Sequence, residues 1–109
     1  MLTDFARRLR AAREEGGISA PDFAERIGLG RTRYLNWERG DNMPQNEALI
    51  VVAEGLGVTT DYLLRGRLEA IPLGRAIRLV AREEGLDPGD RSFDSEKSAA
   101  MVAKAMGRV

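Results

Sequence analysis

The side chains best suited to recognising a ligand gather in one short segment, RTRYLNWER at Arg31–Arg39. The segment reads as a helix between Gly30 and Gly40, with Tyr34 and Trp37 three residues apart on its inner side. That arrangement leaves five side chains on the outer side: Arg31, Thr32, Arg33, Leu35 and Asn36. Arginine can donate two hydrogen bonds to guanine, asparagine can pair with adenine, and a threonine or leucine methyl can meet a thymine methyl. The segment predicts a helix that reads DNA bases, although such a helix taken alone is more often only a solvated surface.

The residues just before this helix indicate a second short helix and a tight turn. Ser19 is a suitable cap, Pro21 suits the first turn, and Gly28-Leu29-Gly30 joins the two helices. Two helices that cross closely need a small residue at the crossing, which Ala24 supplies, and Gly28 tolerates the positive φ that the turn requires. Together with the arginine-bearing face, these features favour a DNA-reading helix pair.

Catalysis is disfavoured by the residue types that the chain lacks. Its 109 residues include no Cys and no His, which removes thiol nucleophiles and the commonest neutral-pH base and metal ligand. The adjacent acids Glu14-Glu15 and Glu83-Glu84 point about 100° apart on a helix, so neither pair forms a shared carboxylate site. We therefore expect no enzyme activity, no cofactor and no metal site.

Length and charge fit one small domain with an appendage. The chain has 17 basic and 17 acidic residues, and residues 1–40 hold eight Arg against six acids, so DNA binding must depend on local placement of charge. No apolar run approaches the roughly 20 residues of a membrane helix, and the start MLTDFARRLR lacks a signal-peptide core. We expect a cytoplasmic protein that does not enter a membrane.

The apolar pattern is helical throughout, and no period-two alternation predicts a strand. Capping and turn residues predict helix starts at Thr3, Ser19, Gly30, about Gln45, Thr59 or Thr60, about Leu73, and Asp94 or Ser95. Glycines predict helix ends at Gly16-Gly17, Gly28, Gly40, Gly57, Gly66 and Gly85. The expected fold class is all-α, with five helices in residues 1–66 and a helical extension in residues 67–109.

The run FAERIGLGRTRYLNWERGDNMP, followed by ALIVVAEGLGVTTDYLLRG, resembles the lambda-repressor-like (Cro and XRE-type) helix-turn-helix family. The resemblance covers roughly residues 3–66. It implies a five-helix DNA-binding domain, usually dimeric, that acts as a transcriptional regulator on an inverted-repeat operator. A repressor that binds double-stranded DNA as a homodimer is the expected function.

The resemblance also implies residue roles. Arg31, Thr32 and Asn36 match positions that meet base edges, with Arg33 beside them; Ser19, Arg39 and, more weakly, Asn42 match positions that touch phosphates. The amino end of the helix at Gly30 adds its dipole to phosphate attraction. Two departures weaken the expected binding: Ala20 stands where many relatives have Gln, and Asp41 stands where many have Lys or Arg.

The extension is expected to pair two copies of the chain. An apolar face of Leu73, Ile77 and Val80, with a second stripe at Met101–Met106, would be exposed on a single copy. Two-fold pairing would bury these faces and set two reading helices about 34 Å apart. The alternative is that both helices fold back onto their own domain. An alternative function is also open: a protein-interaction adaptor or antitoxin that uses the same scaffold to bind a partner protein.

Overall fold

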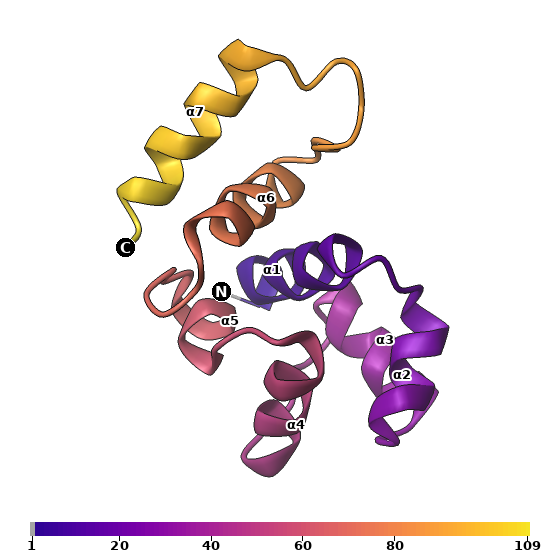
Figure 1. The fold of residues 1–109 in the computed structure, drawn as a ribbon. Coiled ribbons are helices and arrows are strands. Elements are labelled where there is room, and N and C mark those ends of the chain that lie inside the picture. Colours follow the sequence, from indigo (N-terminus) through magenta and orange to yellow (C-terminus); the bar gives the residue numbers. More distant parts are fainter. Residues whose placement is uncertain (1) are drawn as a thin grey trace.

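The computed structural model describes residues 2–109, which form seven helices and no strand (Figure 1). The helices are α1 (Leu2–Glu15), α2 (Ala20–Ile27), α3 (Arg31–Arg39), α4 (Glu47–Leu56), α5 (Thr60–Arg65), α6 (Leu73–Glu83) and α7 (Ser95–Met106). Over this range, no helix combines the length and apolar character required to cross a bilayer. The predicted all-α class is confirmed.

Side-chain caps begin three of these helices where the sequence predicts them. The Ser19 hydroxyl accepts a hydrogen bond from the backbone N–H of Asp22 at 3.2 Å. The Thr59 hydroxyl accepts one from Tyr62 at 2.9 Å, and Asp94 caps α7 in the same way. Each cap satisfies an amide that has no partner within the first turn of its helix.

Two predicted helix starts differ from the structure. Thr3 is not a cap, because α1 already includes Leu2. The fourth helix begins at Glu47 rather than near Gln45, because Asn46 has a φ of 52° and cannot continue a right-handed helix. The apolar face of that helix is unaffected by whether the helix begins near Gln45 or at Glu47.

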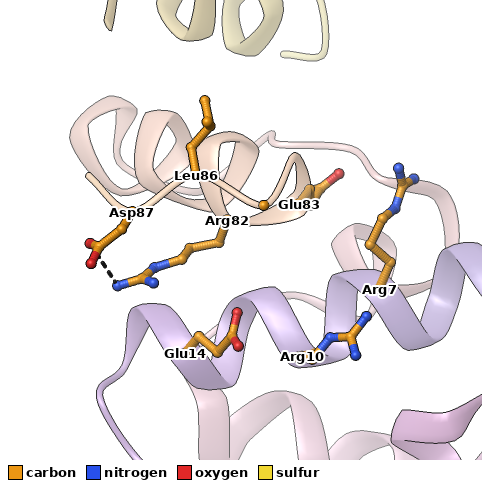
Figure 2. A pocket seen from close by; sticks show the side chains of 8 residues that line it. Arg7, Arg10, Glu14, Arg82, Glu83, Leu86 and Asp87 are labelled. Atoms are coloured by element: carbon orange, nitrogen blue, oxygen red, sulfur yellow. Dashed lines mark ion pairs between the residues drawn. The ribbon is translucent and has the colours of Figure 1, made fainter. Parts of the chain in front are cut away.

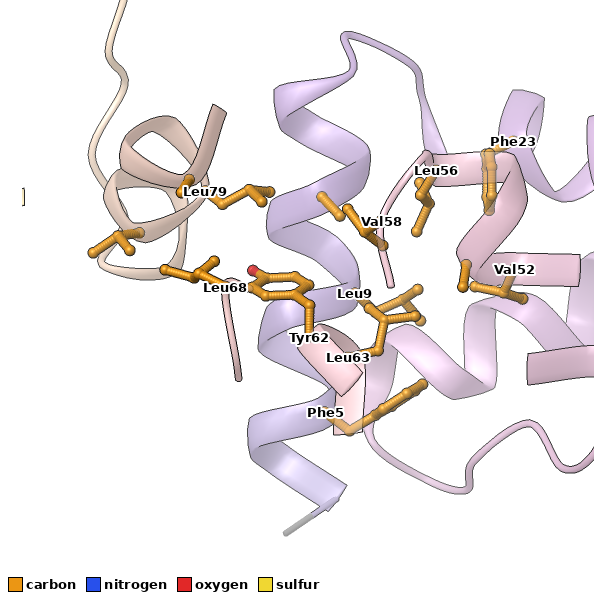
Figure 3. Close-up of a cluster of buried hydrophobic side chains, with 14 of the residues drawn as sticks. Phe5, Leu9, Phe23, Val52, Leu56, Val58, Tyr62, Leu63, Leu68 and Leu79 are labelled. Atoms are coloured by element: carbon orange, nitrogen blue, oxygen red, sulfur yellow. The ribbon is translucent and has the colours of Figure 1, made fainter. Parts of the chain in front are cut away.

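Helix α1 lies at the centre of the fold and has neighbours on two sides. It packs against α3 and α5 on one side and against α6 on the other (Figure 1). Figure 3 shows buried side chains from Phe23 of α2, past Leu9 of α1, to Leu79 of α6. Residues 2–66 and the extension therefore contribute to one hydrophobic core.

The extension folds back on its own chain, because α6 packs on α1 and α7 packs on α6. This packing buries five apolar side chains: Ala76, Leu79, Val80, Met101 and Ala105. The expectation that these faces would be exposed in a single copy is wrong for Val80, Met101 and Ala105, because α6 packs on α1 and α7 packs on α6. Leu73 and Met106 stay exposed, at 47% and 59%. Pairing of two copies through the extension stays a prediction.

Arginine side chains fasten α6 to the preceding helices. Arg75 donates Nη1 to the carbonyl of Gly57 and Nη2 to that of Leu56, both at 2.6 Å, which caps the end of α4. The carboxylate of Glu15 at the end of α1 accepts from Arg75 and from Arg78, each at 2.9 Å. Burial alone would raise the pKa of Glu15, but the hydrogen bonds and charges of Arg78 and Arg75 outweigh it and lower that pKa.

A second set of contacts fastens the end of the described chain. Arg108 donates Nε to the carbonyl of Gly66 at 2.9 Å and Nη2 to Glu83 at 3.0 Å. The Tyr62 hydroxyl donates to the same Glu83 carboxylate at 2.6 Å. Burial, and then the Glu83 charge, raise the pKa of Tyr62, so its hydroxyl stays a donor.

Candidate nucleic-acid interface

The connection between α2 and α3 is set by two glycines with positive φ. Gly28 has a φ of 69° and donates its N–H to the carbonyl of Ala24 at 3.2 Å, which ends α2 in a left-handed cap. Gly30 has a φ of 98° and precedes α3 directly. Ala24 is buried, as expected for a small residue between closely packed helices. The tight turn predicted from the sequence is confirmed.

Aromatic side chains hold the inner face of α3. Tyr34 and Trp37 are buried, and their rings meet edge to face with 6.1 Å between centroids. Phe23 of α2 packs against Tyr34 in a similar way at 5.2 Å. The prediction that Trp37 is a core residue is therefore confirmed, and the inner side of α3 is fixed against α2.

An ion pair fixes the far end of α3 to α1. Arg13 donates Nε and Nη2 to the two carboxylate oxygens of Glu38 at 2.5 and 3.0 Å, and Nη1 to the carbonyl of Ile18 at 2.8 Å. The Tyr34 hydroxyl also donates to Glu38. The hydrogen bond to Glu38 raises the pKa of Arg13. Burial, followed by the hydrogen bond to Glu38, raises the pKa of Tyr34. Glu38 is thus engaged by an arginine of the first helix.

The outer face of α3 is open to solvent. Arg31, Thr32 and Arg33 are exposed, and Asn36 is partly buried. Leu35, which is predicted on the outer side, is instead partly buried and packs against the core. The Arg33 guanidinium lies 5.5 Å from the centroid of the Trp37 ring. In Figure 1 the extension lies away from α2 and α3, so it leaves this face uncovered. The face has the donors and the accessibility that contact with a groove of DNA needs.

A groove of about 370 Å³ runs beside this face, between α3 and the segment that follows it. It is lined by Arg33, Asn36, Trp37, Asn42, Met43, Pro44 and Gln45. The structure thus brings three of the predicted contact residues, Arg33, Asn36 and Asn42, to one place. Met43, Pro44 and Gln45 are not among the contact residues that the sequence predicts, and Gln45 is predicted there only as the approximate start of a helix.

Other predicted residues lie around the groove rather than in it. Gly30 and Arg31 line a separate depression of about 490 Å³ on the α2–α3 face. Ser19 stands at the exposed start of α2, where its hydroxyl oxygen is engaged as the cap. Arg39 is exposed at the end of α3; it donates to the side chain of Asn36 and lies 3.3 Å from the carboxylate of Asp41. The predicted residues therefore do not share one pocket: Gly30 and Arg31 line one depression, and Arg33, Asn36 and Asn42 line another.

A further depression lies elsewhere, between α1 and the end of α6 (Figure 2). It measures about 390 Å³, and its charged lining is mixed, with three arginines and three acids: Arg7, Arg10, Glu14, Arg82, Glu83 and Asp87. Arg82 pairs with Asp87 at 3.3 Å, and the carboxylate of Glu83 is bound by Arg108. Within residues 2–109, no three acidic side chains are grouped so that they could hold a metal ion.

Two short helices with a glycine turn, packed on a third helix and leaving an arginine-bearing face open, define a helix-turn-helix protein. A family model described as helix-turn-helix matches residues 9–63. Over 111 residues the chain is 30% identical to the HTH-type transcriptional regulator ImmR of Bacillus subtilis (strain 168), covering 92% of this chain and 86% of that protein.

Two further relatives match the helix-turn-helix part. The SPbeta prophage-derived uncharacterized HTH-type transcriptional regulator YonR of Bacillus subtilis (strain 168) is 36% identical over 62 residues, 57% of each chain. Repressor protein C2 of Salmonella phage P22 is 31% identical over 61 residues, which cover 56% of this chain and 28% of the repressor. No solved structure gives a significant match. The chain belongs to the lambda-repressor-like helix-turn-helix family and is a DNA-binding transcriptional regulator.

Proposed function

We propose that the chain is a repressor that binds an inverted-repeat operator as a homodimer and reads the major groove with the outer face of α3. In this proposal Arg31, Thr32, Arg33 and Asn36 contact base edges, and Ser19, Gly30, Arg39 and Asn42 contact phosphates. No cofactor takes part, and the protein acts in the cytoplasm, where its DNA target lies.

The observation that carries the proposal is the contrast between the two sides of α3. The inner side is held by buried Tyr34 and Trp37 and by the Glu38–Arg13 ion pair, while Arg31, Thr32 and Arg33 are exposed. A helix whose orientation is fixed can present side chains to base edges with the accuracy that bidentate hydrogen bonds require. The similarity to repressor protein C2 of Salmonella phage P22 supports repression rather than activation.

We further propose that residues 1–66 form the DNA-binding unit and that residues 67–109 contribute to contact between two copies. Leu73, Met106 and Val109 are exposed apolar side chains of that extension. The extension would then hold two reading helices about one DNA turn, roughly 34 Å, apart. A dimer is expected in sedimentation or light scattering of the chain bound to its selected DNA.

Selection of bound duplexes from a random pool tests the proposal, followed by titration of the selected duplex at several salt concentrations. We expect a two-fold symmetric sequence and an affinity that falls as salt rises. Arg31→Ala is expected to weaken preference at one position by about 1–3 kcal/mol. The exposed Arg91, in the loop before α7, supplies the control Arg91→Ala, which should bind as the wild type does.

Equal binding to the selected duplex and to unrelated DNA would contradict the proposal. The alternative, an adaptor or antitoxin that uses this scaffold to hold a protein, would then be supported by a co-purifying partner. The observation that favours this alternative is the position of Asp41, whose carboxylate lies beside Arg39 on the surface proposed to face phosphates. A negative charge there repels DNA and suits a basic protein partner.

A further inference from the structure

Three side chains at the end of α3 form a hydrogen-bonded chain. Arg39 donates Nη2 to the side-chain oxygen of Asn36 and Nε to the carboxylate of Asp41, the latter at 3.3 Å. Because a guanidinium carries only donors, the atom of Asn36 that faces it must be the amide oxygen and not the amide nitrogen. The orientation of the Asn36 amide therefore follows from the chemistry of its neighbour.

The backbone holds these three residues in one turn. Gly40 adopts a φ of 81° and donates its N–H to the carbonyl of Trp37 at 3.2 Å. The next amide, that of Asp41, donates to the backbone carbonyl of Asn36 at 3.0 Å. This pair of bonds is the Schellman ending of a helix, and it brings Asp41 back beside the last turn. Asn36 and Arg39 are three residues apart and so share one face of α3.

An asparagine whose oxygen already accepts from a cation is a poorer partner for adenine, although an amide oxygen has a second lone pair. That pairing needs the oxygen to accept from the adenine amino group while the amide NH₂ donates to N7. Here the oxygen is bonded to Arg39, and the guanidinium charge beside it repels a second N–H donor. What Asn36 can still present is its NH₂ group, directed away from Arg39, and Asn36 lines the groove beside the outer face.

We propose that Asn36 is a donor-only reader that selects guanine, and that Arg39 and Asp41 are the positioning residues that set this preference. Guanine presents two acceptors, N7 and O6, in the major groove, whereas adenine presents one acceptor and one donor and cytosine presents a donor. The cationic Arg39 next to the amide favours the acceptor-rich guanine edge further. The assignment rests on the proposed function and adds to it the base that one position prefers.

The test is selection from a random duplex pool with the wild type and four variants. Asn36→Ala identifies the operator position that Asn36 faces, because preference there disappears. At that position we expect guanine for the wild type and adenine for Arg39→Ala, whose Asn36 oxygen is released; the change should be about 5-fold or more. The double variant Asn36→Ala/Arg39→Ala should show no preference, because Arg39 acts through Asn36.

The fourth variant is a matched control. Arg65→Ala removes an exposed arginine that also pairs with an aspartate, Asp61, at 3.4 Å but lies in α5. It should leave the preference unchanged. Arg39→Ala should bind all duplexes more weakly, because a cation is lost, so the comparison is made between bases and not between affinities. Circular dichroism confirms that each variant is folded.

The outcomes separate the two proposals. A wild type that selects a sequence with adenine at this position, or an Arg39→Ala variant that keeps the wild-type preference, overturns the donor-only assignment and leaves the proposed function standing. An Asn36→Ala variant with the wild-type base preference at every operator position also overturns the donor-only assignment and leaves the proposed function standing. A wild type that selects no sequence overturns the proposed function and, with it, this assignment.

Discussion

Arg13 of α1 donates two hydrogen bonds to Glu38 of α3, and both side chains are nearly buried, at 13% and 9% exposure. The pair joins the helix that carries the exposed arginines to the central helix of the fold. The hydroxyl of Tyr34 and the carbonyl of Ile18 satisfy further polar groups of the pair. The orientation of α3 thus depends on an ion pair that is itself nearly buried.

Replacing Glu38 is therefore expected to destabilise the chain. Glu38→Gln leaves the Arg13 cation partly buried without its counter-charge, and the free energy of unfolding should fall by about 3 kcal/mol. Urea denaturation measures the change. Glu25→Gln, an exposed acid on α2, should stay within about 0.5 kcal/mol of the wild type. A Glu38→Gln variant as stable as this control would contradict the structural role of the pair.

Gly55 is expected to resist substitution although it lies inside a helix. An alanine Cβ there would stand 3.1 Å from both Phe23 and Ile27 of α2. Phe23 is fully buried against Tyr34 and cannot move aside. Overpacking of about 1–3 kcal/mol outweighs the gain of about 1 kcal/mol in helix propensity, so Gly55→Ala should lower the thermal midpoint.

The matched control for that variant is Gly74→Ala in α6. A Cβ at Gly74 would meet its nearest side-chain atom, of Arg78, at an ordinary 3.6 Å. Helix propensity then acts alone, and the thermal midpoint should rise slightly. If both variants shift the midpoint in the same direction, close packing of α4 on α2 is not what limits Gly55.

Acid should weaken the attachment of α6 to α1 through Glu15. Its pKa in the folded chain lies below the ordinary value of 4.5. The stability that it contributes is therefore complete above that ordinary pKa and is lost as pH falls through the lower folded value. The free energy of unfolding should decline on acidification below about pH 5, and Glu15→Gln should decline less steeply.

The neighbouring acid provides the control for this pH dependence. Glu14 is exposed and, within residues 2–109, joins no ion pair. Glu14→Gln should retain the wild-type slope of unfolding free energy against pH between about 5 and 3. Parallel curves for Glu14→Gln and Glu15→Gln would show that the bonds to Arg75 and Arg78 do not stabilise the fold.

Arg108 is expected to matter for stability despite its place at the end of the sequence. Arg108→Ala removes the bonds to Gly66 and to Glu83, whose side chain is only 5% exposed. Arg108 itself is 28% exposed, so the loss should be about 2 kcal/mol, below the range for a fully buried pair. Denaturant unfolding of Arg108→Ala, compared with the control Arg91→Ala, measures this loss of stability. Equal unfolding midpoints for the two variants would show that the bonds of Arg108 do not stabilise the fold.

Helix boundaries and the two sides of α3 could be predicted because their causes are local. Gly28 and Gly40 adopt the positive φ that ends a helix, and Ser19 and Thr59 cap the following turns with their own hydroxyls. The spacing of Tyr34 and Trp37 assigns the inner side of α3 without knowledge of any partner. None of these features requires a contact distant in the sequence.

The contacts of the extension could not be predicted, because periodicity reveals an apolar face but not what covers it. The face of α6 could have met a second copy, and the structure places it on α1. Likewise, nothing near Arg75 in the sequence indicates that its guanidinium caps α4, eighteen residues or more away. Arg39 and Asn36 have an i, i+3 spacing, but that spacing is equally compatible with two separate DNA contacts and does not by itself predict their hydrogen bond.

The shared core has a practical consequence for dissecting the protein. Leu68, Leu79 and Val80 are fully buried together with Leu9 and Tyr62. A polypeptide that ends after Gly66 would therefore lack part of its hydrophobic core. The two parts should melt in a single cooperative transition rather than in sequence. An isolated N-terminal fragment would expose an apolar surface of the first helix and would tend to aggregate. Binding experiments should therefore use all 109 residues rather than the fragment.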